Sequence, residues 1–186
     1  MHLGHIGCRF LILFHDALID DLVFLHQALM LAEILDILKT ITVHLLGQVV
    51  DQLDQALVDL QPEFFCVAPR GDEFVRQAVK AADADYLLAE EDGAVVGFAL
   101  VNYAGWTPEF SCVLPHRYAC LADLVVDEAH RQQGIGSTLL GAAKRWARDR
   151  RLEYLELSVL SQNAPAIALY ESHDFVEATR VMRCML

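Results

Sequence analysis

The residues with the clearest potential for chemistry are two glycines separated by one residue, Gly134 and Gly136, between an apolar run and a helical pattern. Glycine lets a backbone turn tightly and approach a ligand, because no Cβ stands in the way. The first N–H groups of a helix have no partner inside it, and with the helix dipole they attract phosphate. The sequence therefore predicts a phosphate-binding turn made of Arg131, Gln132, Gln133, Gly134, Ile135, Gly136, Ser137 and Thr138.

Two nucleotide-binding motifs do not fit this turn. Ser137 has no lysine before it, which excludes a P-loop. Leu139 stands where the dinucleotide-binding fingerprint needs its third glycine. What remains is the short pattern R-x-x-G-x-G, which an ordinary strand–turn–helix connection could also carry.

A second element follows about 27 residues later and also combines polar groups with a helical pattern. It opens at Asn163, contains Tyr170 between Leu169 and Glu171, and ends at Phe175. The phenol of Tyr170 has an unperturbed pKa of about 10, so it is protonated at neutral pH and can donate a proton.

The two elements together, in this order and spacing, resemble the GCN5-related N-acetyltransferase (GNAT) superfamily over residues 85–185. Residues 1–84 match only as a strand followed by helices, whereas residues 121–136 also look like diamine N-acetyltransferases. The resemblance implies one domain over residues 1–186 with the GNAT fold, of class α/β (α+β). In this fold helices flank a mixed central sheet of about six to seven strands, and strands four and five splay apart.

The resemblance also implies a site and a mechanism. Acetyl-CoA, the acyl donor, lies where the two parallel strands part, and Leu124 and Val126 bond it through their backbone. Tyr170 protonates the leaving thiolate, and an amine attacks directly without a metal or a covalent intermediate. The coenzyme-binding set that the resemblance implies is Leu124, Val125, Val126, Arg131, Gln132, Gln133, Gly134, Ile135, Gly136, Ser137, Thr138 and Asn163.

Each of these residues also has a purely structural interpretation. The glycines could serve only the turn, and Arg131 could be a solvated turn residue. Tyr170 lies on an apolar helical face and could be a core side chain. Asn163 could cap the short helix that Pro165 opens, a role compatible with coenzyme binding.

Two positions depart from the family pattern. Asp174 stands where the family often has glycine, although aspartate tolerates positive φ better than most residues. Ala122 stands where diamine acetyltransferases carry a glutamate general base on the fourth strand. The neighbouring Asp123 is expected on the opposite face, because side chains alternate along a strand.

Hydrophobic periodicity predicts alternating strands and helices. The predicted strands are residues 9–14, 86–89, 95–101, 118–126, 155–160 and 175–185, with a hairpin turn at 90–93 and a loop at 104–116. The predicted helices are residues 17–38, 47–60, 73–82, 136–150 and 164–172. Asp72 is a predicted N-cap, and the predicted inward face of the fourth helix is Leu139, Leu140, Ala143, Trp146 and Ala147.

Composition and charge exclude several classes of function. Residues 1–116 carry 17 acidic and 5 basic side chains, so the net charge of −12 lies in this half, and residues 117–186 are balanced. Nucleic-acid binding needs a basic surface and is not expected. Five scattered cysteines and eight unpaired histidines predict neither a disulfide framework nor a metal site. No apolar run reaches the length of about 20 residues that spans a membrane, which predicts a cytoplasmic protein.

Three functions remain compatible with the sequence. The first is transfer of an acetyl group to a small amine, which the acidic half predicts to be cationic. The second is acetylation of a protein N-terminus or lysine, and the third is a binding module without turnover. A homodimer is compatible with each of these functions.

Overall fold

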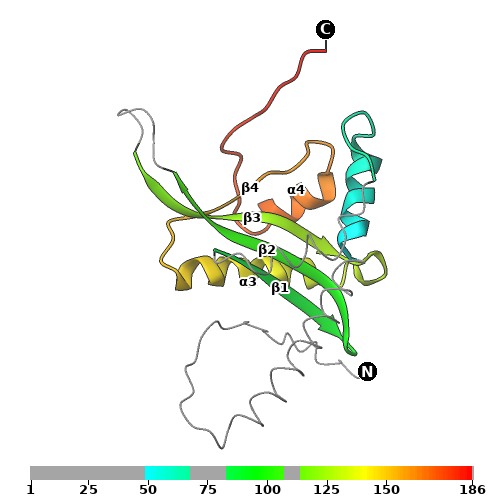
Figure 1. Cartoon of the computed structure of the whole chain (residues 1–186), viewed down its shortest axis with the longest axis horizontal. Helices are drawn as coiled ribbons and strands as arrows, with labels where there is room; N and C mark the ends of the chain where they lie inside the picture. Colours follow the sequence, from blue (N-terminus) through cyan, green and yellow to red (C-terminus); the bar gives the residue numbers. More distant parts are fainter. Residues whose placement is uncertain (1–48, 68–82, 107–113, 186) are drawn as a thin grey trace, which may run out of the picture.

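The structure is a computed structural model that describes residues 49–67, 83–106 and 114–185. The predicted strand at 9–14, the predicted helices at 17–38 and 73–82, and the predicted cap at Asp72 lie outside these residues. The described chain forms one sheet with helices packed around it (Figure 1).

The sheet contains four strands in sequence order: β1 (Ala84–Glu91), β2 (Ala94–Trp106), β3 (His116–Val126) and β4 (Leu155–Leu157). The first three strands are antiparallel, and β4 runs parallel to β3. The hairpin turn is shorter than predicted, because Glu90 and Glu91 pair within the sheet. Only Asp92 and Gly93 remain in it, with φ of 50° and 81°, the positive values that a two-residue hairpin of matching twist requires.

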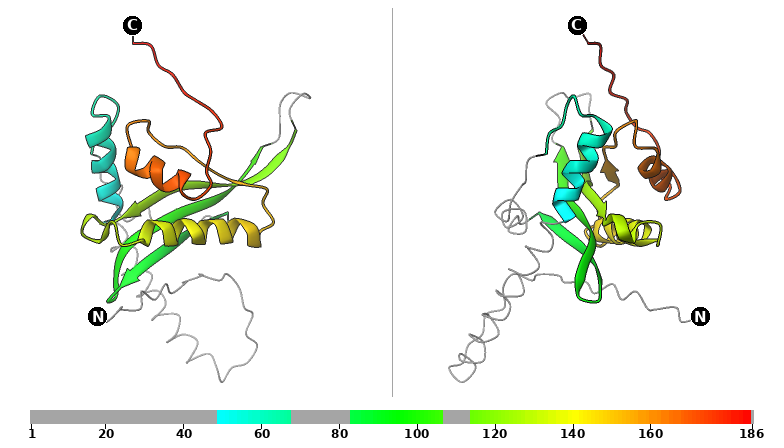
Figure 2. Two further views of the ribbon diagram at one scale, coloured as in Figure 1. Left: turned by 180° about the vertical axis from the view of Figure 1, so that it is seen from behind. Right: turned by 90° about the vertical axis from the view of Figure 1, so that its right-hand side faces the viewer.

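The sheet is covered on both faces, so the described chain has two apolar cores. Helix α3 (Ile135–Asp149) packs on one face, and all five predicted inward residues of this helix are buried. Figure 2 shows α3 lying across this face. On the other face, Val49 and Val50 of the helix at residues 49–60 pack against Phe98, Leu100 and Val125. This helix confirms the described part of the prediction for residues 47–60.

Helix α4 (Ala164–Glu171) and the 3-10 turn η1 (Glu128–His130) complete the described elements. The prediction of closing strands at 175–185 is wrong, because residues 176–185 leave the sheet as an exposed tail (Figure 1). Val176 and Met182 are each 86% exposed, so these apolar side chains pack on no neighbour that would hold a strand. The predicted strand at 155–160 also ends early, at Leu157. The described residues therefore contain four strands.

Candidate active site

The parallel strands β3 and β4 part after a short stretch of pairing. Ala119, Cys120 and Leu121 pair with Leu155, Glu156 and Leu157, and the register ends there. Strand β3 nevertheless continues to Val126, paired with β2 on its other side. Beyond the last pair the two strands separate, as the predicted splay requires, and we call the unpaired stretch beside residues 122–126 of β3 the opening.

A β-bulge sets which backbone groups face this opening. Leu121 pairs with Val101 and Asp123 pairs with Leu100, so Ala122 is one extra residue in β3. Beyond the bulge, the Asp127 N–H donates to the Val96 carbonyl oxygen at 2.9 Å. In an antiparallel pair the direction alternates with each residue. The N–H and C=O groups of Leu124 and Val126 therefore point away from β2 into the opening, whereas those of Val125 point to β2.

The predicted phosphate-binding turn connects β3 with α3. Gly134 is the N-cap of α3 and has a φ of 82°, and Gln132 has a φ of 62°. The first bond of the helix runs from the Thr138 N–H to the Gly134 carbonyl oxygen at 3.0 Å. The N–H groups of residues 135–137 precede this bond and have no acceptor within the helix. The first turn carries no acidic residue that would repel an anion.

The second glycine brings the two predicted elements together. A Cβ on Gly136 would lie 3.2 Å from Leu169 Cδ2 of α4 and 3.8 Å from Val126 Cγ2 of β3. The turn, the end of β3 and the helix that carries Tyr170 therefore meet at this position. Gly136 serves close packing, whereas Gly134 has no heavy atom within 4 Å of an added Cβ.

Several side chains of the turn support its backbone. Arg131 Nε donates to the Val126 carbonyl oxygen at 3.2 Å, across the mouth of the opening. Thr138 Oγ1 donates to the Gly134 carbonyl oxygen at 3.1 Å, and Gln133 Nε2 donates to the Ala129 carbonyl oxygen at 3.4 Å. These contacts fix the turn from within and leave its exposed outer surface to solvent.

Asn163 caps α4, as one of its two interpretations predicts. Its Oδ1 accepts a hydrogen bond from the Ala166 N–H at 3.2 Å, and Pro165 occupies the first turn. Just before it, the Oε1 of Gln162 accepts from Gln61 Nε2 at 2.8 Å. This bond ties the end of helix 49–60 to the start of α4.

Tyr170 is held by the C-terminus of α4. The Phe175 N–H donates to the Tyr170 carbonyl oxygen at 3.1 Å, and the Asp174 N–H donates to the Glu171 carbonyl oxygen at 3.1 Å. With Asp174 at a φ of 64°, this is a Schellman motif, and its usual apolar contact is the Tyr170–Phe175 ring pair at 5.9 Å. Asp174 thus takes the left-handed conformation of the family's glycine. Burial raises the pKa of Tyr170, which keeps its phenol protonated.

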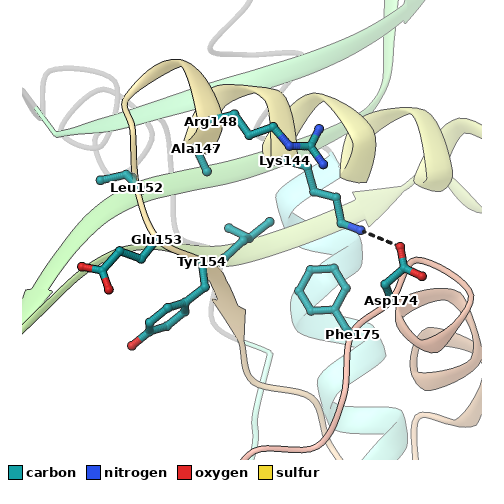
Figure 3. A pocket seen from close by; sticks show the side chains of 9 residues that line it. Lys144, Ala147, Arg148, Leu152, Glu153, Tyr154, Asp174 and Phe175 are labelled. Atoms are coloured by element: carbon teal, nitrogen blue, oxygen red, sulfur yellow. Dashed lines mark ion pairs between the residues drawn. The ribbon is translucent and has the colours of Figure 1, made fainter.

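Lys144 of α3 fastens this motif from the outside (Figure 3). Its Nζ donates to the His173 carbonyl oxygen, lies 3.8 Å from Asp174 Oδ2 and stands 5.2 Å above the Phe175 ring. Lys144, Asp174 and Phe175 line a shallow pocket of about 280 Å³ beside the C-terminal half of α3. None of the predicted coenzyme-binding residues lines this pocket, so it is separate from the opening.

A polar network at the end of β3 was not predicted from the sequence. The Asp127 carboxylate accepts hydrogen bonds from Gln52 Nε2 at 2.8 Å and from His130 Nδ1 at 2.5 Å. The hydrogen bond from Gln52 lowers the pKa of Asp127 most, and the hydrogen bond from His130 lowers it further. His130 Nε2 lies 3.6 Å from Glu91 Oε2. The i, i+3 spacing of Asp127 and His130 is the one local signal for this network.

Two further classes of feature are absent from the described residues. Within residues 49–67, 83–106 and 114–185, no three histidine, cysteine or acidic side chains are grouped so that they could hold a metal ion. None of the helices in these ranges is long and apolar enough to span a bilayer.

Known proteins share both the sequence pattern and the fold. The family model for the acetyltransferase (GNAT) family matches residues 50–175. The chain is 34% identical over 96 residues to streptothricin acetyltransferase of Streptomyces lavendulae, a match that covers 50% of this chain and 46% of that protein. It is 33% identical over 106 residues to the uncharacterized N-acetyltransferase YhfO of Bacillus subtilis, with coverage of 57% and 68%. The chain thus spans about half the length of the first of these relatives.

A solved structure supports the fold independently. A mutant of the BH1408 protein from Bacillus halodurans superimposes with a TM-score of 0.71 over 75% of this chain and 90% of that one, at 21% identity. At this identity the likeness concerns the fold alone. The family model covers well over half of the chain, from helix 49–60 to Phe175. The chain therefore belongs to the acetyltransferase (GNAT) family.

Proposed function

We propose that this chain is an N-acetyltransferase that moves an acetyl group from acetyl-CoA to the primary amine of a small cationic molecule. The observation that carries the proposal is the meeting of three elements at the opening between β3 and β4. Val126 at the end of β3 and Leu169 of α4 both pack against Gly136 of the turn. Tyr170 packs against the same apolar core as Leu124 and Leu157, which flank the opening.

The residues around the opening suit the parts of the coenzyme. The N–H groups at the start of α3 have no acceptor within the helix and would hold the pyrophosphate, because a helix N-terminus attracts anions. The backbone groups of Leu124 and Val126 would bond the amides of the pantetheine arm, as an added strand does in a sheet. Asn163 would bond the same arm while it caps α4.

Bound acetyl-CoA supplies an acetyl group activated as a thioester. Tyr170 donates the proton that the departing sulfur needs, and burial supports this role because it keeps the phenol protonated. The half-buried side chain lies in the apolar core around the opening, where water competes less for the proton. The amine attacks the carbonyl carbon directly.

The acceptor is proposed from charge. The negative excess lies within residues 1–116, and helix 49–60 carries Asp51, Asp54 and Asp59 on the sheet face opposite α3. A negative field concentrates cationic amines near this face. The relative from Streptomyces lavendulae is by name a streptothricin acetyltransferase, which supports a small molecule over a protein as acceptor.

A free-thiol assay with acetyl-CoA and a panel of amines tests the proposal. We expect thiol release with cationic amines. We also expect that kcat/KM for cationic amines falls as the salt concentration rises, whereas kcat/KM for matched neutral amines does not. A preference for neutral amines would remove the cationic acceptor but leave acetyl transfer. Coenzyme binding in calorimetry without thiol release with any amine would instead favour the binding module. The absence of a carboxylate at position 122, which is alanine, also favours the binding module.

A further inference from the structure

The bulge in β3 changes the face on which Asp123 lies. Cross-strand partners share a face of the sheet, and the partner of Asp123 is Leu100. Leu100 packs with Phe98 and Val125 in the core under helix 49–60, on the face away from α3. Leu121, in contrast, packs with α3. Ala122 is the extra residue between them, so the regular alternation predicted from the sequence does not hold from Leu121 to Asp123, which lie on opposite faces.

The electrostatics of Cys120 support this placement. The pKa of the Cys120 thiol is raised by burial first and then by the charges of Glu156 and Asp123. Residues three apart on a regular strand point to opposite faces. The influence of Asp123 on Cys120 agrees with the bulge, which puts both on one face. Glu156 is the register partner of Cys120 on β4, so the three groups surround the same region.

Asp123 also lies where the opening begins. Leu121 and Leu157 form the last pair between β3 and β4, and Asp123 follows just beyond it. The α3 face is filled at this level by the core around Leu124 and Leu157 and by the helix that carries Tyr170. The other face carries Asp123, Cys120 and Glu156 at this level, so an acceptor that approaches from that face meets a carboxylate.

We propose that Asp123 is the general base of the reaction, an assignment that rests on the proposed acetyl transfer. Its carboxylate takes one proton from the acceptor ammonium, directly or through one water, and the neutral nitrogen attacks the thioester carbonyl. The C–N bond forms, the C–S bond breaks, and Tyr170 protonates the thiolate. The second proton on nitrogen is released to solvent, and solvent reprotonates the phenolate of Tyr170. The net products are the N-acetyl amine, free thiol and the proton that Asp123 releases.

Replacement of one oxygen tests this assignment. Asp123→Asn keeps the size of the side chain and removes the base, so kcat/KM for the amine at pH 7 should fall by about 10²–10⁴-fold. The remaining activity should rise about tenfold per pH unit toward the pKa of the amine, because only the neutral amine then reacts. Affinity for CoA should stay within about twofold of wild type. Asp149→Asn, at the exposed end of α3, is the matched control and should keep the wild-type pH profile.

A relocated carboxylate provides a second measurement. Ala122→Glu added to Asp123→Asn puts a longer acid on the neighbouring position, and we expect recovery of at least tenfold in rate and of the wild-type pH profile. Wild-type turnover with an unchanged rate and profile in folded Asp123→Asn would overturn the assignment and leave acetyl transfer standing. If Asp123→Asn does not fold, two other variants test the assignment of Asp123 as the general base. A wild-type pH profile in Asp123→Glu would support the assignment, and wild-type rates in Asp123→Ser would overturn it. A wild-type chain that binds CoA without turnover would overturn both proposals.

Discussion

The placement of phosphate at the α3 N-terminus can be tested by charge at Gly134. This residue and Gly93 are a natural pair, with φ of 82° and 81° and no heavy atom within 4 Å of an added Cβ at either position. Aspartate at each would meet the same backbone strain, roughly 1–2 kcal/mol for a left-handed residue. Only Gly134 lies at the proposed phosphate site, so Gly93→Asp controls for the strain and for the added net charge.

The expected magnitude follows from the charge alone. A carboxylate about 5 Å from a phosphate is repelled by about 0.8 kcal/mol at the dielectric constant of water and about 3 kcal/mol at an effective value of 20. These energies correspond to affinities for CoA that are between about 4-fold and about 300-fold weaker. Gly134→Asn adds nearly the same volume without the charge, so its loss of affinity should be smaller.

Isothermal calorimetry with CoA at low and high salt is the assay. We expect the highest affinity for CoA in wild type and Gly93→Asp, a lower affinity in Gly134→Asn and the lowest in Gly134→Asp. The difference between the two Gly134 variants should become smaller at high salt, because salt screens the repulsion. Undiminished affinity in folded Gly134→Asp would refute the placement. Equal losses in the asparagine and aspartate variants would show that the turn acts sterically and not through phosphate.

Three further outcomes are expected. Tyr170→Phe removes only the proton donor, so kcat should fall by about 10²–10⁴-fold in the thiol assay with CoA affinity unchanged; a fall of only a few-fold would make Tyr170 a core residue. Asp174→Gly relieves the left-handed backbone at a φ of 64° and should raise the free energy of unfolding by about 0.5–1 kcal/mol in urea titrations, whereas Asp174→Ala should lower it. Because the pKa of Asp127 is lowered from 3.8, its stabilising contribution is present above that value and is lost as the pH falls through the folded value. Asp127→Asn should therefore reduce the loss of stability between about pH 5 and pH 2, and an unchanged acid slope would contradict the network.

Local pattern predicted the elements that carry their own signals. The helical spacing of Leu139, Leu140, Ala143, Trp146 and Ala147 is strong, and each is buried as predicted. The Asp92–Gly93 turn has the residue types that positive φ favours, so the hairpin was predicted although its turn is shorter. The site elements at 131–138 and 163–175 were located by motif, and their contact through Gly136 agrees with the fold implied by the resemblance.

The failures concern features that no local pattern encodes. The tail at 176–185 contains the strand-forming residues Val176, Thr179 and Val181, but it does not pair with the edge strand β4, so no strand forms there. The bulge at Ala122 inserts one residue into a run that reads as a regular strand, so the predicted alternation does not hold between Leu121 and Asp123. The bond from Gln52 to Asp127 joins positions 75 residues apart, a distance over which periodicity carries no information.

The single extra residue in β3 changes which residues of the strand direct their peptide groups away from β2. Before Ala122, odd-numbered residues turn their peptide groups to β4, as the bond from the Ala119 N–H to the Tyr154 carbonyl oxygen shows. After it, even-numbered residues turn their peptide groups away from β2 toward the opening, and these include Leu124 and Val126. Many side-chain substitutions in β3 would preserve this pattern, but deletion of one residue would reverse it. The peptide groups of Val125 would then face the opening. The apolar side chains after the deletion would move from the core on one face of the sheet to the core on the other face.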